Sequence, residues 1–424
     1  MAEPAAASPT RVRWVIFVLA CAASWLLYLH RYSWGVIKPF FREQHPEISD
    51  VEIGWLDSAF QGSYAFGQLP AGMLGDVFGA RLILSATVLA WSVAAVAVAW
   101  VAGVWALASI RVVFGLTQAG AYPVLSKMTR TWFPLSIRTS VQGTVTAWGR
   151  LGAAASPIIV ATFLMGYWEL SWQDALSLLL IPGAMLALLL WVFLRNRPRE
   201  HPWCNAAERS LLDDDDASPV GVPRLTPAAA PLSLAMLCAY SFVSTFQDQL
   251  YVYWIPTFLV EGHGMSKTDM GLFTPLPLIG GAIGGILGGL LNDYLIRRTG
   301  KRRWSRSGIA LAGKTMQGLF VLWCIQAPDG PSAMTILCAA RIFGNWGLST
   351  QWGAITDMGG PGAATLFGLV NTFGAIGGFA AGPILGGLKQ AYGWEGLLSG
   401  VAIMCLLAGL TWLFIDCRQR LVRE

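Results

Sequence analysis

Residues Gly72–Arg81 read G-M-L-G-D-V-F-G-A-R, and Gly289–Asp293 read G-L-L-N-D shortly before Arg297 and Arg298. Each copy follows a long apolar segment and has the form G-x-L-x-D with basic residues after it. Gly72 and Gly289 lie 217 positions apart, about half of the 424-residue chain. A charged turn repeated at this period between apolar segments indicates a membrane protein built from two similar halves, an organisation typical of transporters.

The composition is that of a membrane protein. Hydrophobic residues make up 55% of the chain and charged residues only 12%, whereas a soluble domain carries about 25% charged residues. The seven cysteines contain no C-x-x-C pair, so neither a metal site nor a disulfide framework is expected. The basic residues behind the net charge of +5 lie between the apolar runs, which argues against a nucleic-acid partner.

The apolar runs of roughly 20 residues predict an all-α membrane protein with twelve spans in two pseudo-symmetric six-helix bundles. The spans are expected at residues 14–38, 54–76, 82–101, 104–128, 138–165, 174–195, 233–260, 269–296, 307–327, 332–357, 362–388 and 394–416. A polar stretch with four consecutive aspartates, Asp213–Asp216, separates the sixth span from the seventh. The predicted division is an N-terminal bundle (1–195), a cytoplasmic linker (196–232) and a C-terminal bundle (233–424).

Lysine and arginine predict the orientation in the membrane. With the N-terminus inside, cytoplasmic segments hold 20 of the 29 basic residues, and external loops hold four, Lys38, Arg42, Lys267 and Lys389. This bias predicts that both termini are cytoplasmic.

Five basic residues fall within the predicted spans: Arg31, Arg111, Arg150, Lys314 and Arg341. A charge at mid-membrane costs at least ~2.5–3.5 kcal/mol, so each needs a wet cavity, a partner or a route to the interface. Lys314 lies about two helical turns from a cytoplasmic end, and we expect its side chain to reach the interface. The other four cations need a polar interior.

Polar residues recur at helical spacing beside these cations, which predicts a central aqueous cavity. Gln61 and Tyr64 share one face of the second span, and Gln118 lies two turns after Arg111 on the fourth. The N-terminal half supplies Arg31, Arg111 and Arg150, and a guanidinium matches the planar geometry of a carboxylate or phosphate. Asp248, the deep acid of the C-terminal half, stands 217 positions after Arg31. The pattern favours an organic anion as substrate, with Asp248 or His30 as a coupling site.

The chain resembles the major facilitator superfamily, and within it the anion:cation symporter family of sugar-acid carriers. The likeness is carried by Gly72–Arg81, Tyr28–Arg31, Arg111 with Gly115 and Pro123, Trp132–Pro134, Arg197–Pro202, Trp254–Pro256, and Asn371 with Gly377, Gly378 and Pro383. The family pattern has Asp where this chain has His30, and Glu where it has Gln118. The resemblance implies an anion site at Arg31 and Arg150, with Tyr64, Arg111 and Asn371 as further members, and leaves the coupling route open. Y-x-x-R with Gln118 is also similar to organophosphate:phosphate antiporters.

The sequence therefore predicts a bacterial inner-membrane secondary transporter, not an enzyme, that moves a sugar acid or other carboxylate by alternating access. It is expected to act as a monomer without cofactor or metal, coupled to H⁺ or Na⁺. Organophosphate:phosphate antiport is the alternative, and a membrane sensor or channel is a weaker one. The predicted substrate-binding residues are Arg31, Tyr64, Arg150, Arg111, Gln61, Gln247 and Asn371. The predicted coupling and gating residues are Asp248, His30, Gln118, Asp76, Arg81 and Asp293.

Overall fold

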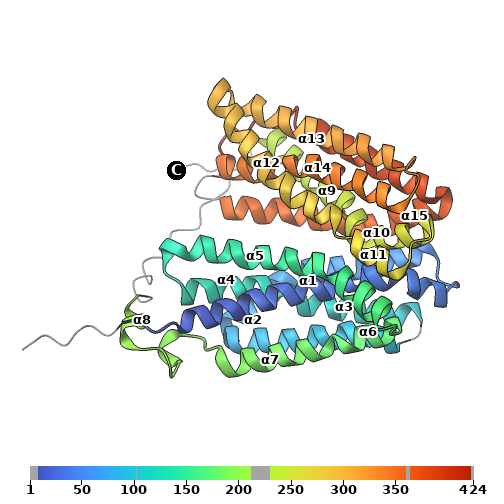
Figure 1. Ribbon diagram of the computed structural model, residues 1–424. Coiled ribbons are helices and arrows are strands. Elements are labelled where there is room, and N and C mark those ends of the chain that lie inside the picture. The colour runs from blue at the N-terminus through green and yellow to red at the C-terminus, as the bar shows by residue number, and fades with distance from the viewer. Residues whose placement is uncertain (1–7, 102, 212–229, 360–362, 422–424) are drawn as a thin grey trace, which may run out of the picture. The chain divides into compact units, whose positions relative to one another are not determined.

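The computed structural model describes residues 8–101, 103–211, 230–359 and 363–421 (Figure 1). Within these residues the chain is entirely helices, turns and irregular segments. The helices are α1 (Val12–Gln44), α2 (Asp50–Ala97), α3 (Val104–Ala119), α4 (Ala121–Trp132), α5 (Leu135–Pro157), α6 (Trp172–Leu178), α7 (Leu180–Phe193), α8 (Ala206–Ser210), α9 (Pro231–Gln249), α10 (Ile255–Thr257), α11 (Lys267–Phe273), α12 (Leu276–Thr299), α13 (Arg302–Cys324), α14 (Gly330–Gly359) and α15 (Ala363–Thr411). The predicted all-helical class is confirmed, while about half of the predicted cytoplasmic linker, residues 212–229 with Asp213–Asp216, lies outside the described residues.

Seven helical segments in the described part of the chain are long and apolar enough to cross a membrane. They cover Val12–Gln44, Val77–Trp100, Val104–Trp132, Ser140–Tyr167, Trp172–Phe193, Lys267–Thr299 and Leu366–Thr411. The helices α9, α13 and α14 coincide with other predicted spans. All three carry polar side chains that are buried within the protein.

Two glycines break long helices near predicted boundaries between spans. Gly79 interrupts α2 with φ of 83°, and Gly393 interrupts α15 with φ of 65°. Glycine adopts positive φ without steric penalty, whereas other residues do so rarely. At Gly79 a Cβ atom would also lie 2.4 Å from the amide of Asn196. The first copy of the repeated turn, Gly72–Arg81, therefore contains a break between two helices at Gly79.

The described residues belong to two compact units. The N-terminal unit comprises the described residues of Met1–Trp34, Ser63–Ser156 and Leu170–Pro219. The C-terminal unit comprises those of Gly35–Gly62, Pro157–Glu169 and Val220–Glu424.

Small residues bring helices into close contact within the N-terminal unit. A Cβ atom at Gly152 of α5 would lie 2.0 Å from the carbonyl oxygen of Trp25 on α1. One turn further, Ser156 Oγ donates a hydrogen bond of 2.9 Å to the carbonyl of Leu29. Backbones that approach this closely gain packing contacts that lipid cannot supply. This pair of helices positions the α1 residues of the candidate site.

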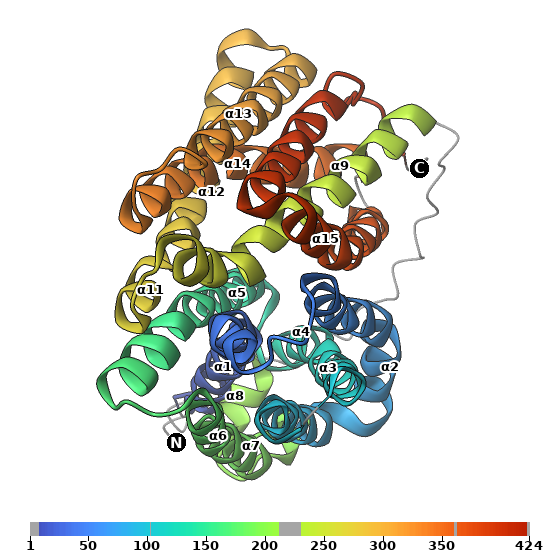
Figure 2. The ribbon, with the colours of Figure 1, turned by 90° about the vertical axis from the view of Figure 1, so that its right-hand side faces the viewer.

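Small residues also bring helices into close contact in the C-terminal unit, in which α12, α13 and α14 pack side by side (Figure 1). A Cβ atom at Gly284 of α12 would lie 2.1 Å from the carbonyl oxygen of Ile342 on α14. Helix α9 packs along α15 (Figure 2), where Gly377 meets the backbone of Phe242. The regularly spaced glycines of α12 and α15 therefore allow these helices to pack closely on their neighbours.

The start of α1 is fixed by a buried carboxylate from the segment after α7. Glu208, 0% exposed, accepts from the backbone N–H of Val12 at 3.2 Å and of Arg13 at 3.0 Å. It also accepts from Thr10 Oγ1 at 2.5 Å. The first N–H groups of a helix have no partner within the helix, and a carboxylate there also interacts favourably with the helix dipole.

Candidate functional site

Arg31 lies at the centre of a cluster of polar and aromatic side chains in the N-terminal unit. Its Nε donates to Gln118 Oε1 at 3.0 Å. The guanidinium carbon lies 4.4 Å from the ring centroid of Tyr64 and 5.0 Å from that of Tyr28. Cation–π contacts of this kind contribute ~0.5–2 kcal/mol each. These contacts orient the guanidinium without adding negative charge to the cluster.

Gln118 holds this arrangement together. It is fully buried on α3, and its amide Nε2 donates to the carbonyl oxygen of Leu27 at 3.1 Å. Its oxygen must therefore face Arg31, because the amide nitrogen is engaged with α1. In this structure Gln118 is a positioning residue for Arg31.

Three other predicted residues of the N-terminal unit, Arg111, Arg150 and His30, have different surroundings from Arg31. Arg111 is 2% exposed, with its guanidinium 5.1 Å from the ring centroid of Trp34. The side chain of Arg150 is exposed on α5. His30 is 1% exposed, and its Nε2 lies 3.3 Å from the carbonyl oxygen of Leu179. The imidazole therefore points toward the α6–α7 junction, while Arg31 points toward α3.

Asp248 forms an ion pair with Arg341 in the C-terminal unit. The guanidinium of Arg341 also lies 4.3 Å from the ring centroid of Tyr251. The Asp248 side chain is 35% exposed, so this ion pair borders open space. Of the other predicted residues in this unit, Gln247 is fully buried and donates to Gln317 Oε1 at 3.2 Å, while Asn371 is exposed on α15.

Gln61 lies beside the glycine-rich face of α15. A Cβ atom at Gly378 would lie 2.8 Å from Gln61 Nε2 and 3.0 Å from Gln249 Nε2. The side-chain amides of Gln61 and Gln249 thus both lie next to Gly378 within the C-terminal unit.

The predicted latch residues are described only in part. The side chain of Asp76 lies outside the described residues. Arg81 donates through Nε to the carbonyl oxygen of Trp191 at 2.8 Å and through its backbone N–H to Asn196 Oδ1 at 3.0 Å. Asp293 is exposed on α12. The latch role stays a prediction.

Charged side chains of the C-terminal unit form two paired groups that the sequence did not reveal. Lys38 and Asp57 are 0% and 2% exposed, with Nζ 2.7 Å from Oδ2. Nearby, Arg42 pairs with Asp50 and with Glu261, the latter at 2.9 Å. Lys389 pairs with the same two acids, at 3.3 Å and 2.6 Å. We call these last four residues, Arg42, Asp50, Glu261 and Lys389, the ion ring.

Lys314 is the clearest departure from expectation. It is 2% exposed, and its Nζ donates to Ser244 Oγ at 3.2 Å and to Gln317 Oε1 at 3.1 Å. The prediction that this side chain reaches the membrane interface is wrong. The aliphatic part of the Lys314 side chain points into the C-terminal unit because Gly347 leaves room for it. A Cβ atom at Gly347 would lie 3.1 Å from Lys314 Cε.

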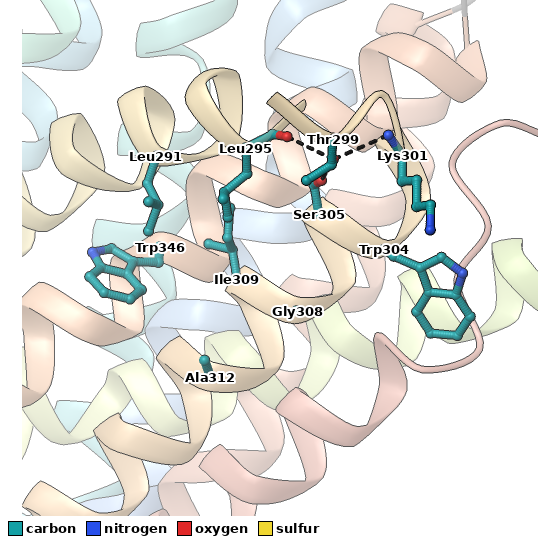
Figure 3. Close-up of a pocket in the computed structure, with 10 residues that line it drawn as sticks. All are labelled: Leu291, Leu295, Thr299, Lys301, Trp304, Ser305, Gly308, Ile309, Ala312 and Trp346. Atoms are coloured by element: carbon teal, nitrogen blue, oxygen red, sulfur yellow. Dashed lines mark hydrogen bonds between the residues drawn. The ribbon is translucent and has the colours of Figure 1, made fainter. Parts of the chain in front are cut away.

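A cleft between α12 and α13 contains none of the predicted residues (Figure 3). Its polar edge is the turn at Thr299, whose Oγ1 donates to the carbonyl oxygen of Leu295 and accepts from the N–H of Lys301. The other lining residues are mainly apolar, including Trp304 and Trp346. Among the described residues, no group of three or more His, Cys, Asp or Glu is placed to hold a metal.

Long apolar helices joined by glycine contacts, with charges paired inside the protein, define a multi-pass integral membrane protein. The chain belongs to the Major Facilitator Superfamily, whose family model matches residues 14–382 and 237–422. The predicted membership is confirmed.

Several bacterial transporters are similar to this chain over most of its length. It is 27% identical over 390 residues to a probable sulfoacetate transporter of Cupriavidus necator, covering 90% of this chain and 89% of that protein. It is 26% identical to the hexuronate transporter of Bacillus subtilis, covering 90% of each. It is 25% identical to the D-galactonate transporter of Escherichia coli, covering 97% of each.

Solved structures share the fold at lower identity. The inward-facing structure of a bacterial homologue of the human lysosomal transporter Spinster aligns with a TM-score of 0.79 at 17% identity, covering 97% of each chain. A D-xylose–proton symporter aligns with a TM-score of 0.72 at 14% identity, covering 96% of this chain and 98% of that one.

Proposed function

We propose that the protein is a secondary transporter of a small organic anion, a sugar acid or related carboxylate, that works by alternating access. The observation that carries the proposal is the setting of Arg31. Gln118, Tyr28 and Tyr64 orient its guanidinium, and all three are neutral groups. A carboxylate suits such a cation because it accepts two parallel hydrogen bonds from one guanidinium.

The relatives support the substrate class. Their names specify sulfoacetate, hexuronate and D-galactonate, and all three are organic anions. In the proposed site Arg31 binds the carboxylate with help from Arg111 or Arg150, and Tyr64 binds a hydroxyl group. Gln61, Gln247 and Asn371 are further proposed hydroxyl ligands.

The proposal includes the membrane arrangement expected from the sequence. It has twelve spans in two six-helix halves (1–195 and 233–424), a cytoplasmic linker (196–232), cytoplasmic termini and a place in the bacterial inner membrane. The protein acts as a monomer with no enzymatic step, and uptake is coupled to H⁺ or Na⁺. His30 and Asp248 are proposed coupling residues, and Asp76, Arg81 and Asp293 proposed gating residues.

Counterflow in proteoliposomes tests the proposal. Vesicles loaded with unlabelled galactonate, glucuronate or sulfoacetate should accumulate the same labelled anion. Arg31→Ala should reduce this exchange to the background of empty vesicles. Arg31→Lys should retain only part of it, because an ammonium lacks the planar fork.

The matched control is Arg130→Ala, which removes an exposed arginine at the end of α4 and should leave exchange intact. Near-normal exchange by Arg31→Ala would refute the assigned site. Exchange of sugar phosphate for phosphate without carboxylate uptake would replace the proposal by organophosphate antiport.

A further inference from the structure

Lys314 is a buried basic group for which the proposed function has no use. Its stem passes between α14 and α15: a Cβ atom at Gly347 would lie 3.1 Å from Lys314 Cε, and one at Gly409 would lie 3.3 Å from Lys314 Cβ. The two oxygens that accept from its Nζ, Ser244 Oγ and Gln317 Oε1, are both neutral. The surrounding helices thus form a pocket that fits this side chain, with neutral oxygens around the amino group.

The ionisable groups around Lys314 come from three helices. Asp248 and Tyr240 lie on α9, Arg341 on α14 and Cys405 on α15. The Tyr240 ring centroid lies 5.8 Å from Nζ. The one carboxylate of this group, Asp248, is engaged by Arg341 in this structure. Two basic side chains, Lys314 and Arg341, therefore share one acid.

The position of Asp248 allows an exchange of partners. Asp248 follows Ser244 by four residues on α9, so the two side chains occupy one face of the helix about one turn apart. Ser244 is already in contact with Lys314 Nζ. A rotation of the Asp248 side chain toward Ser244 would bring its carboxylate from Arg341 toward Lys314.

We propose that Lys314 is the group that carries the coupling proton, and that Asp248 links its protonation to substrate binding at Arg341. An oxygen atom of the bound anion takes the place of Asp248 on Arg341, and the released Asp248 carboxylate moves to Lys314. A carboxylate beside an amine favours its charged form, so the neutral amine takes up a proton from water. When the anion leaves, Asp248 returns to Arg341 and Lys314 releases the proton to water.

This exchange makes the anion and the proton bind cooperatively. Without a carboxylate, a buried ammonium is costly in free energy, and loss of the proton removes that cost. With the Asp248 carboxylate beside the Lys314 ammonium, the attraction between the two charges offsets the cost of burying them. Linkage requires that if the anion favours the proton, the proton favours the anion to the same degree. The result is symport of an organic anion with H⁺, and the inference rests on the proposed function.

Lys314→Arg provides the sharpest test, because arginine keeps the charge and remains protonated at every working pH. In proteoliposomes at equal pH on both sides, we expect galactonate counterflow by Lys314→Arg within about threefold of wild type. Uptake driven by an inward proton gradient, with proton entry followed by an internal pH dye, should fall at least tenfold. Lys389→Arg is the matched control and should retain both activities.

The outcomes separate the two proposals. If wild type shows no counterflow with any organic anion, the proposed function and this inference both fail. If wild type exchanges galactonate and Lys314→Arg still accumulates it with proton entry, only this inference fails, and Lys314 is a structural cation. If Lys314→Arg does not fold, Asp248→Asn gives the same test. It removes the linking acid and should also retain counterflow while losing gradient-driven uptake, and retained gradient-driven uptake would again refute the inference.

Discussion

Replacement of Lys38 by methionine should destabilise the protein strongly, although the side chain is of similar size. Lys38 Nζ lies 2.7 Å from Asp57 Oδ2, and the two side chains are 0% and 2% exposed. The substitution leaves the Asp57 carboxylate buried without this cation. Breaking a buried ion pair on one side costs about 3–5 kcal/mol.

A second contact adds to this cost. Lys38 Nζ lies 4.5 Å from the ring centroid of Trp254, and a desolvated cation–π contact contributes up to about 2 kcal/mol. One kcal/mol changes the melting temperature of a 150–250-residue domain by about 2–4 °C. We therefore expect a decrease in melting temperature on the order of 10 °C for Lys38→Met.

Thermal unfolding of the purified protein in detergent measures this effect. Lys267→Met is the matched control, because Lys267 is exposed on α11 and its loss should cost less than about 1 kcal/mol. The double variant Lys38→Met/Asp57→Leu should recover most of the loss, since a buried ion pair is often replaceable by apolar residues. A Lys38→Met protein as stable as Lys267→Met would refute the reasoning, as would a double variant less stable than the single one.

Three further predictions concern other parts of the chain. Gln118→Glu should place a carboxylate on Arg31 and raise the KM of galactonate counterflow at least tenfold, and an unchanged KM would contradict the assigned role of Gln118. Gly152→Val should prevent α5 from packing on α1, because a Cβ atom there would lie 2.0 Å from Trp25 O. That variant should lose most folded protein in detergent chromatography, whereas Gly143→Val, where a Cβ meets open space, should not. Burial holds the pKa of His201 below its ordinary value of about 6.5, so its stabilising contribution should be complete above that pH and decline as the pH falls. Melting curves from pH 8 to pH 5 check this, and a His201→Asn variant with the same pH slope as wild type would contradict it.

The physical basis of the His201 prediction is its hydrogen-bond pattern. Nδ1 accepts from the backbone N–H of Trp203 at 3.2 Å, so Nε2 carries the proton and donates to the carbonyl oxygen of Phe193 at 3.1 Å. Protonation of Nδ1 would remove the acceptor. The unfolded chain therefore binds protons more readily than the folded one, and acid favours unfolding.

The sequence predicted features that depend on position along one helix. Gln118 lies two turns after Arg111, and that spacing was sufficient to place it on a polar face beside the predicted cavity. Gly79 and Gly393 break α2 and α15 between predicted spans. The ends of the apolar runs were sufficient to predict these junctions, because each run is long enough for one span.

Features that depend on neighbouring helices were not predictable from spacing. The distance of Lys314 from the end of its span suggested a route to the interface, but Gly347 and Ser244 of other helices draw it inward. Lys38 was counted among external basic residues, yet Asp57 and Trp254 enclose it. A buried lysine in a transporter can be recognised only once the helices that supply its oxygens are known.

The ion ring has a consequence for its resistance to mutation. Each acid, Asp50 and Glu261, contacts both cations, and each cation, Arg42 and Lys389, contacts both acids. Removal of any one member leaves the other three joined through the member opposite. The three segments that carry the remaining residues therefore stay tied together after any single loss, and two opposite members must be lost before the connection is broken. Charge redundancy of this kind allows individual positions to change during evolution while the closed arrangement of the segments is preserved.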